Sequence, residues 1–395
     1  MDPYLRPAET FIEGSRTLPG KYYTSDEVYR EELEKIFYDA WICAGRADQV
    51  PEPGDYILRE IGEESIIIVR DRKGKINAYY NVCRHRGTRL VIEEKGRFSA
   101  CIQCPYHAWT YDLAGNLIGA PLMDELEGFS KSDYSLHRAA IGQWEGFLFV
   151  NLAHQPVLLE SVFAPVAGKF AAWDLPHLQA LRRKEYEVKA NWKLIVQNYS
   201  ECYHCPLIHP DLARRSPYRS GKNDLYEGPF LGGYMELNED FGSLTMSGRA
   251  CGLPIGEVSG EDLERVYYYS IFPNMLLSLH PDYVMAHTLW PQSPDRTHII
   301  CEWLFSKDQM EQGGFNPDDA AEFWDMTNRQ DWQVCELSQL GVRSRMYSPS
   351  PYSGVESLLA AFDRQVLKAL QHDYQDQSSR KPGASGKIGE NNDQN

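Results

Sequence analysis

Apolar positions near the start of the chain recur at a helical spacing. They predict a helix over residues 24–41, with Thr24 and Glu27 in the positions of a capping box. The apolar residues with this spacing are Val28, Leu33, Phe37 and Trp41.

Between Asp55 and about Leu152 the pattern changes to short runs rich in β-branched and aromatic residues. The runs are separated by turn sequences such as Arg72-Lys73-Gly74-Lys75. The clearest of them are 56–58, 65–69, 78–82 and 146–150. This part of the chain is therefore expected to form a small antiparallel β domain.

After Val157 helical and strand patterns are mixed. One long helix is expected to begin at Asn316 as the N-cap, with Pro317 in the first helical position. The other expected elements are helices over about 191–205 and 355–370, and strands over 265–271, 284–290 and 298–305. The sequence thus predicts an α+β protein. The polar tail from Gln375 to Asn395 is expected to be disordered.

Charge and composition narrow the classes of function. The formal net charge is −16, which disfavours nucleic acid and anionic membrane surfaces as partners. No run of 18 apolar residues predicts a transmembrane helix, and residues 1–16 lack the features of a secretory signal. The nine cysteines are therefore interpreted as thiols or metal ligands, and a cytoplasmic location is expected.

A first group of metal-ligating residues lies in the β domain. Cys83 and His85 are followed, after 18 intervening residues, by Cys104 and His107. Two thiolates on one iron and two imidazoles on the other are the ligands of a mixed-ligand [2Fe–2S] cluster. Structural zinc is the alternative, but zinc fingers usually pair Cys with Cys and His with His. The neighbouring Cys101 does not have the Cys-x-x-His spacing and is interpreted as an ordinary buried thiol.

A second group lies in the segment 191–210, which contains His204 and His209. The two histidines are five residues apart, so they diverge on a continuous helix. Pro206 is expected to interrupt the helix and let His209 return toward His204. Two imidazoles and one carboxylate form the facial triad of non-haem iron(II) oxygenases. If both histidines are ordinary surface or core residues, no metal site is needed.

The carboxylate is expected from the helix that begins at Pro317. Asp331 shares one stripe with Trp324, Asn328 and Cys335, whereas Glu322, Asp325, Arg329 and Glu336 form a more charged stripe that is interpreted as solvated. Asp331 is therefore the acid on the inward face.

The two groups together resemble the α subunits of Rieske non-haem iron oxygenases. The resemblance is carried by Cys83-Arg84-His85-Arg86-Gly87, by Cys104-Pro105-Tyr106-His107-Ala108-Trp109, and by the segment 191–210. It implies a small antiparallel Rieske domain at 43–156 and a helix-grip catalytic domain at 157–373. The residues 1–42 would join the catalytic domain, and 374–395 would form the tail.

The resemblance also implies roles and partners. It implies a Rieske [2Fe–2S] cluster, a mononuclear Fe(II), and a bridging role for Glu201 between His204 and a cluster histidine of a neighbouring subunit in a homotrimer. Because no Gly-x-Gly-x-x-Gly loop follows a strand, electrons are expected from a separate flavin and iron–sulfur reductase or a ferredoxin.

The segments 339–344 and 348–356 look similar to the branch that oxidises choline, betaine and carnitine-like compounds, and Tyr267, Tyr268 and Tyr269 offer rings to a cation. Oxidation of an aromatic ring or aromatic acid is the alternative substrate class. An electron-transfer protein without oxygenase activity, or a zinc-stabilised binding protein, are the alternatives from other classes.

Overall fold

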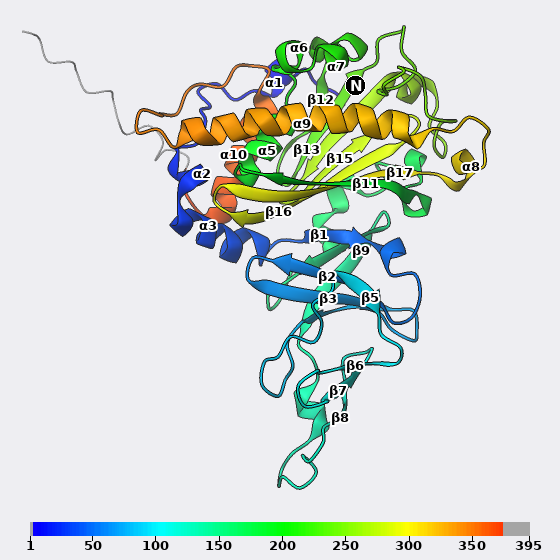
Figure 1. Ribbon diagram of the computed structural model, residues 1–395. Helices are drawn as coiled ribbons and strands as arrows, with labels where there is room; N and C mark the ends of the chain where they lie inside the picture. The colour runs from blue at the N-terminus through cyan, green and yellow to red at the C-terminus, as the bar shows by residue number, and fades with distance from the viewer. Residues whose placement is uncertain (1–2, 374–395) are drawn as a thin grey trace, which may run out of the picture.

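The computed structural model describes residues 3–373. Figure 1 shows a broad upper part, built on a large sheet crossed by one long helix, and a narrower lower part made of strands. The combination of helices with antiparallel sheets confirms the predicted α+β class. The predicted disordered tail lies outside the described residues.

The lower part contains one seven-stranded antiparallel sheet and a small sheet at its tip. The order in the first sheet is β1-β10-β9-β4-β3-β2-β5, and β6-β7-β8 form the second. The strands are β1 (Ile42–Arg46), β2 (Asp55–Ile61), β3 (Glu64–Arg70), β4 (Ile76–Tyr80), β5 (Lys95–Arg97), β6 (Cys101–Gln103), β7 (Thr110–Asp112), β8 (Leu117–Gly119), β9 (Arg138–Trp144) and β10 (Phe147–Asn151).

Strand β3 shows why this sheet joins the two parts of the molecule. Successive side chains of a strand point to opposite faces. Ile66 and Ile68 belong to the core of the upper part, whereas Ile67 and Val69 belong to the core beneath the tip. Because both faces are buried, residues 66–69 of this strand are apolar without alternation.

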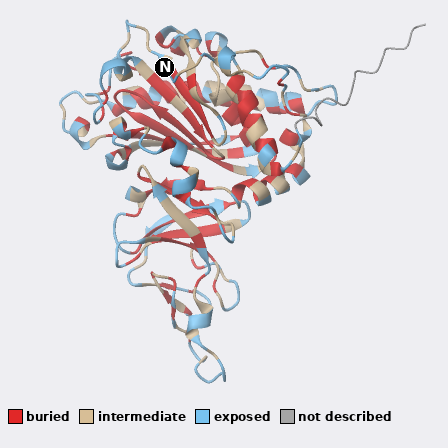
Figure 2. Cartoon of the chain, turned by 180° about the vertical axis from the view of Figure 1, so that it is seen from behind, coloured by how far each residue is buried: buried red, intermediate tan, exposed pale blue. Residues whose placement is uncertain are grey.

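The upper sheet has seven antiparallel strands in the order β11-β17-β16-β15-β14-β13-β12. They are β11 (Gln179–Val188), β12 (Lys222–Glu227), β13 (Phe230–Glu236), β14 (Arg265–Ile271), β15 (Met275–Leu279), β16 (Val284–Ser293) and β17 (Arg296–Phe305). Figure 2 shows that buried residues are concentrated along this sheet and the elements that cover it.

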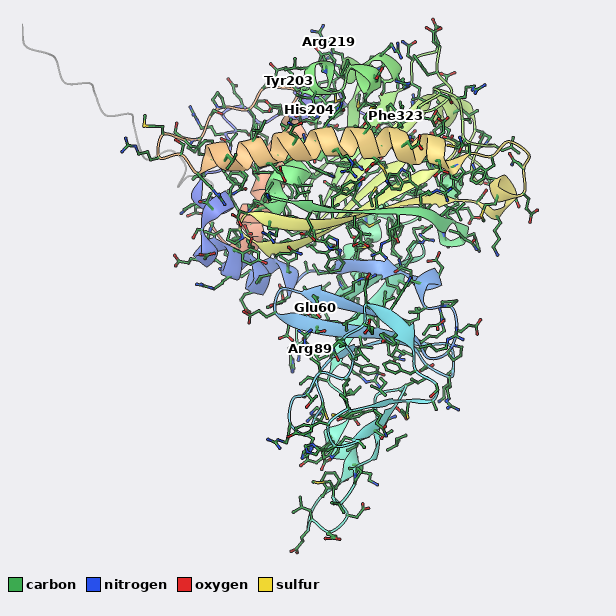
Figure 3. The ribbon with its side chains drawn as sticks, in the orientation of Figure 1. Glu60, Arg89, Tyr203, His204, Arg219 and Phe323 are labelled. Carbon is green, nitrogen blue, oxygen red and sulfur yellow. A yellow bond between two sulfur atoms is a disulfide. The ribbon has the colours of Figure 1, made fainter. Side chains whose placement is uncertain are left out.

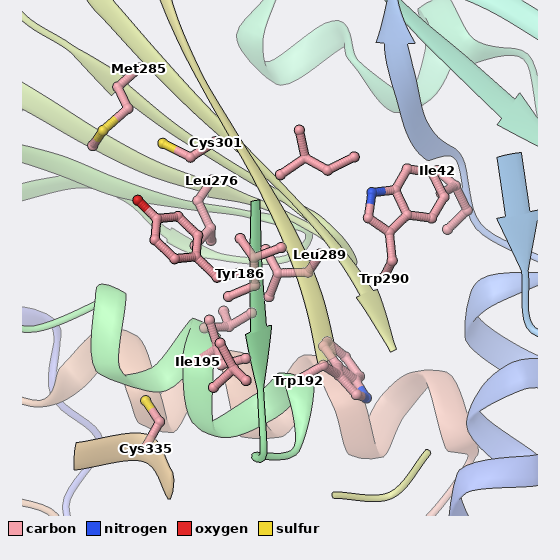
Figure 4. Close-up of a cluster of buried hydrophobic side chains, with 14 of the residues drawn as sticks. Ile42, Tyr186, Trp192, Ile195, Leu276, Met285, Leu289, Trp290, Cys301 and Cys335 are labelled. Atoms are coloured by element: carbon pink, nitrogen blue, oxygen red, sulfur yellow. The ribbon is translucent and has the colours of Figure 1, made fainter. Parts of the chain in front are cut away.

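Helices cover the upper sheet. The α-helices are α1 (Pro7–Thr10), α2 (Lys21–Thr24), α3 (Asp26–Glu32), α4 (Leu159–Val162), α5 (Trp192–Tyr199), α6 (Cys205–Ile208), α7 (Pro210–Arg215), α8 (Lys307–Met310), α9 (Pro317–Val342) and α10 (Ser357–Leu370). The π-helical turn η1 spans Leu33–Phe37, and the 3₁₀ turns are η2 (Ala47–Gln49), η3 (Lys131–Tyr134), η4 (Ala164–Val166), η5 (Ala171–Trp173), η6 (Leu175–His177), η7 (Tyr218–Ser220) and η8 (Gly260–Glu264). In Figure 4, Trp192 and Ile195 of α5 contribute to the core beside Leu289 and Tyr186 of the sheet.

Helix α9 has the inward face that its sequence predicts, but its charged stripe is only partly solvated, because Asp325 and Glu336 are half-buried and accept hydrogen bonds from the Tyr186 hydroxyl and the Lys189 N–H. Trp324 and Asn328 are buried, whereas Glu322 and Arg329 are exposed. Asn316 is the N-cap residue and Pro317 follows it, but the Asn316 side chain makes no capping hydrogen bond.

Two expected helices are shorter than predicted. The first is capped by Ser25, whose hydroxyl accepts hydrogen bonds from the backbone of Glu27 and Val28, so the capping box assigned to Thr24 is wrong. It ends in the π-helical turn before Trp41. The second helix, α5, ends at Tyr199 instead of Cys205. Within residues 3–373 no helix is long and apolar enough to span a bilayer.

Candidate metal centres

Two loops of the lower part have the same backbone design. In one, the Gly87 N–H donates to the Cys83 carbonyl at 3.0 Å, and in the other the Ala108 N–H donates to the Cys104 carbonyl at 3.1 Å. Gly87 and Ala108 have φ values of 74° and 57°. A left-handed conformation is unfavourable for alanine. Ala108 adopts this conformation because the loop turns back directly after Cys104 and His107.

The side chains of the four expected cluster ligands meet between these loops. Cys83 and Cys104 are buried, and both histidines are exposed. The rings of His85 and His107 have centroids 4.8 Å apart. Trp109 is buried and stacks on His85 with an interplanar angle of 7°. The thiols therefore lie inside the protein, and the imidazoles form its surface.

Neighbouring aromatic groups fix this arrangement. Tyr111, which the sequence analysis did not single out, is within hydrogen-bonding distance of Cys83 Sγ at 3.4 Å and accepts from the Arg84 N–H at 3.0 Å. Burial raises the pKa of the Cys83 thiol. Tyr106 stacks on His107 at 3.7 Å between ring centroids. Cys101 is half-buried in β6, so its expected full burial is wrong.

The ligand atoms of the two loops are not gathered as closely as those around a single metal ion. A single tetrahedral zinc ion draws its ligand atoms to within about 4 Å of one another. Among the described residues, the only set of three or more potential ligands within 4.8 Å of one another lies elsewhere, at His204, His209 and Asp331. The Cys and His side chains of the two loops are therefore spread more widely than one ion requires.

The second group of potential metal ligands lies where the chain is helical with two interruptions. His204 follows the end of α5 and precedes α6, and His209 lies between α6 and α7. Pro206 is in the first turn of α6, and Pro210 begins α7. Pro206 thus starts a helix, and the expectation that it ends one is wrong. The two histidines are nevertheless turned toward one point, as the sequence predicts.

Asp331 of α9 completes this group. Its Oδ1 lies 3.2 Å from His204 Nε2 and 2.7 Å from His209 Nε2. Metal bonds to nitrogen and oxygen ligands of about 2.1 Å place neighbouring ligand atoms roughly 3 to 3.5 Å apart. Gln330 Oε1 lies 2.7 Å from the other ring nitrogen of His209. These distances fit one divalent metal ion held by two imidazoles and a carboxylate. The sequence analysis assigned no role to Gln330, although it directly precedes Asp331.

Glu201 contacts His204 from the opposite side. Its Oε1 lies 2.6 Å from His204 Nδ1, and its Oε2 accepts from the backbone N–H groups of Tyr203 and His204. Glu201 is in a loop, so the helical geometry assumed from the sequence is wrong, but the contact exists. A carboxylate at Nδ1 leaves Nε2 free to bind a metal.

The charges of this group are strongly coupled. Burial by itself lowers the pKa of His204, but the hydrogen bonds that its ring donates to Asp331 and Glu201 outweigh it and raise that pKa to about 10. Burial raises the pKa of Asp331, and the two histidines reverse this and hold it below its ordinary value.

A cavity begins at these three ligands. It is lined by aromatic side chains that include Tyr199, Tyr268, Trp324 and Trp332, and its volume is about 130 Å³. Figure 3 places His204 and Tyr203 beside α9 in the upper part, and Glu60 and Arg89 in the lower part.

Cys202 and Cys205, on either side of His204, form a disulfide. The expectation that the cysteines are thiols or metal ligands is wrong for this pair. The Cys205 N–H donates to the Cys202 carbonyl at 3.2 Å, and this turn brings the two sulfur atoms together.

Comparisons with known proteins agree with both groups of residues. Residues 40–130 match the family described as the Rieske [2Fe–2S] domain, and residues 175–372 match the ring-hydroxylating α subunit catalytic domain. The chain is 31% identical over 377 residues to the glycine betaine monooxygenase oxygenase subunit of Chromohalobacter salexigens, with 86% of this chain and 82% of that protein covered.

Solved structures extend the similarity. A quaternary ammonium Rieske monooxygenase, studied for carnitine oxidation by gut microbiota and inter-subunit electron transfer, superimposes with a TM-score of 0.75 at 27% identity, covering 93% of this chain and 98% of that one. Naphthalene 1,2-dioxygenase from Rhodococcus sp. shares the fold, with a TM-score of 0.75 at 20% identity and coverage of 90% and 94%.

This chain belongs to the Rieske-type ring-hydroxylating oxygenase α subunits. It is an oxidoreductase that uses O₂, and its cofactors are a Rieske [2Fe–2S] cluster and a mononuclear iron.

Proposed function

We propose that this chain is the terminal oxygenase component of a monooxygenase that hydroxylates or N-demethylates a quaternary ammonium compound. The observation that carries the proposal is the aromatic cavity beside His204, His209 and Asp331. Support comes from the glycine betaine monooxygenase subunit and the carnitine-oxidising relative.

The cavity offers a cation aromatic rings but no free carboxylate, and its wall also contains Lys222. Glu201 and Asp331 are the acidic residues that line it, and both already contact histidines. A trimethylammonium group would instead contact the faces of Tyr268, Trp324 and Trp332. Such contacts contribute about 2 kcal/mol or more when the cation is desolvated.

We assign the cofactors to the residues that the structure brings together. Cys83, Cys104, His85 and His107 would hold the cluster, because this donor set combines two thiols and two imidazoles. His204, His209 and Asp331 would hold the mononuclear iron, which supplies O₂ activation when bound. Glu201 would keep the proton on His204 Nδ1 and so fix the ring orientation.

The domain division from the sequence also belongs to this proposal. Residues 43–156 would form the Rieske domain, and 157–373 with 1–42 the catalytic domain. The grouping of 1–42 with the catalytic domain is supported by direct contacts with α5: the Gln197 amide donates to the Tyr23 hydroxyl at 3.0 Å, and Lys193 forms a buried ion pair with Glu32.

We propose that electrons pass between subunits of a homotrimer. His85 and His107 are exposed at one end of the folded molecule. At the other end, a second hollow of about 280 Å³ is lined by Glu201 and His204. Nearby Tyr203 is 61% exposed. An exposed cluster edge on one subunit could thus approach Glu201 of the next.

The remaining partners follow from the oxygenase chemistry. O₂ and a small-molecule substrate would enter the catalytic domain, and a separate flavin/iron–sulfur reductase or a ferredoxin would reduce the cluster. A cytoplasmic location is part of the same proposal.

The bridging role predicts a kinetic defect in Glu201→Gln. The variant should retain the cluster spectrum and the bound iron, but oxidation of the reduced cluster in the presence of substrate and O₂ should slow by about tenfold or more, because the charge at Nδ1 is lost. Single-turnover stopped-flow absorbance measures this rate. Glu356→Gln, in the wall of the same hollow, is the matched control. A wild-type rate in Glu201→Gln would show that Glu201 is not the bridge.

The substrate class is tested by turnover with a reductase. NADH and O₂ consumption should respond to carnitine, betaine or choline-like compounds, with formaldehyde or a hydroxylated product formed. Turnover of benzoate or phthalate-like acids, without a response to any quaternary amine, would favour the aromatic alternative.

A further inference from the structure

A buried histidine lines the aromatic cavity without a role in the metal centre. His287 of β16 is 1% exposed, and neither of its ring nitrogens makes a hydrogen bond shorter than 3.5 Å among the described residues, although the side chain of Asn328, which also lines the cavity, lies close to the ring. It is outside the group of potential ligands formed by His204, His209 and Asp331. A buried polar group without a partner is unfavourable and requires an explanation, which a bound ligand can supply.

A second unpaired donor lies next to His287, where α9 meets the sheet. Trp332 of α9 is 7% exposed, and its indole N–H has no acceptor among the described residues. Its ring is perpendicular to that of His287, with the centroids 6.2 Å apart. The sheet and the helix thus each present one N–H-bearing ring to the same cavity.

His287 is uncharged in this environment. Burial dominates and lowers its pKa to about 4, although Asn328 and Asp331 act in the opposite direction. The neutral ring keeps one N–H donor, and the indole is a donor only. Two neutral donors favour an oxygen acceptor over a cation, whereas the ring faces beside them favour the cation.

We propose that His287 and Trp332 are specificity-determining residues that hydrogen-bond an acceptor oxygen on the substrate. The cavity would then take a quaternary ammonium compound that carries a carboxylate or hydroxyl oxygen, in preference to a simple tetraalkylammonium ion. This inference rests on the proposed function and identifies the part of the substrate that the aromatic faces do not recognise.

The test is binding to the oxidised holoenzyme without reductase, measured by isothermal titration calorimetry. Glycine betaine supplies a carboxylate, choline a hydroxyl, and tetramethylammonium neither. His287→Phe keeps a ring but removes both nitrogens, and it should weaken the binding of the oxygen-bearing ligand by about tenfold. Its affinity for tetramethylammonium should be unchanged. The comparison of betaine with choline identifies which oxygen is bound.

His280 provides a matched control. It is fully buried, neither ring nitrogen has a partner among the described residues, and burial lowers its pKa well below the ordinary value. It stacks on Tyr283 and is absent from the cavity wall, and its edge-to-face packing against Tyr268 and Trp324 is a ring contact that phenylalanine retains. His280→Phe should therefore alter the affinity for none of the three ligands.

Trp332→Phe is the second variant, since it removes the other donor and keeps an aromatic face. The cluster spectrum and iron content report that each variant is folded. Equal losses for all three ligands, or no loss in either variant, would overturn the inference while leaving the proposed function intact. Binding of aromatic acids but of no quaternary amine to the wild-type protein would overturn the proposed function and the inference together.

Discussion

Asp331→Ala is expected to abolish turnover and to reduce mononuclear iron from about one ion per chain to nearly none. Asp331 provides the carboxylate whose Oδ1 lies within 3.2 Å of both histidine Nε2 atoms. Its removal leaves two neutral ligands on a divalent ion and removes the charge that balances it. His204→Ala and His209→Ala should have the same effect.

The measurements are iron content, the visible cluster spectrum and substrate-dependent O₂ consumption. The cluster spectrum should remain in all three variants, because the cluster residues lie in the lower part of the molecule. Glu322→Ala is the matched control, since Glu322 is an exposed acid on the same helix. An active Asp331→Ala protein that still holds its iron would exclude Asp331 as the third ligand and direct attention to the other acids of α9.

Loss of one cluster ligand should have an equally large effect, in this case on the [2Fe–2S] cluster. Cys104→Ala or His107→Ala is expected to eliminate the visible chromophore, because each removes one of the two ligands of one iron. Without the cluster, reductase-driven turnover should also stop. The iron bound at His204 should remain.

Cys101→Ala is the control for this experiment. Cys101 is three residues from Cys104 but lies in β6, half-buried, before the loop begins. Its replacement should leave the absorption spectrum unchanged. A colourless Cys101→Ala protein beside a coloured Cys104→Ala protein would show that the sulfur ligand was assigned to the wrong residue.

Local spacing was sufficient to identify most of the candidate ligands. Each Cys–His pair lies in one tight loop, and the short spacing within the pair keeps its two side chains close together. Asp331 could be selected because the 3.6-residue period of a helix separates an inward stripe from the exposed stripe of Glu322 and Arg329. The antiparallel β domain could be predicted for the same reason, since strand periodicity is a local property of the sequence.

Only the tertiary structure decided the contacts that join distant segments. Glu201 reaches His204 through a loop and not through the helix inferred from spacing, because α5 ends at Tyr199. His287 is an isolated histidine in an apolar strand, and no sequence period distinguishes it from a core residue. Its position opposite Trp332, 45 residues later in the chain, exists because α9 packs across the sheet. Sequence periodicity records which face of an element is buried, whereas packing determines what that face meets.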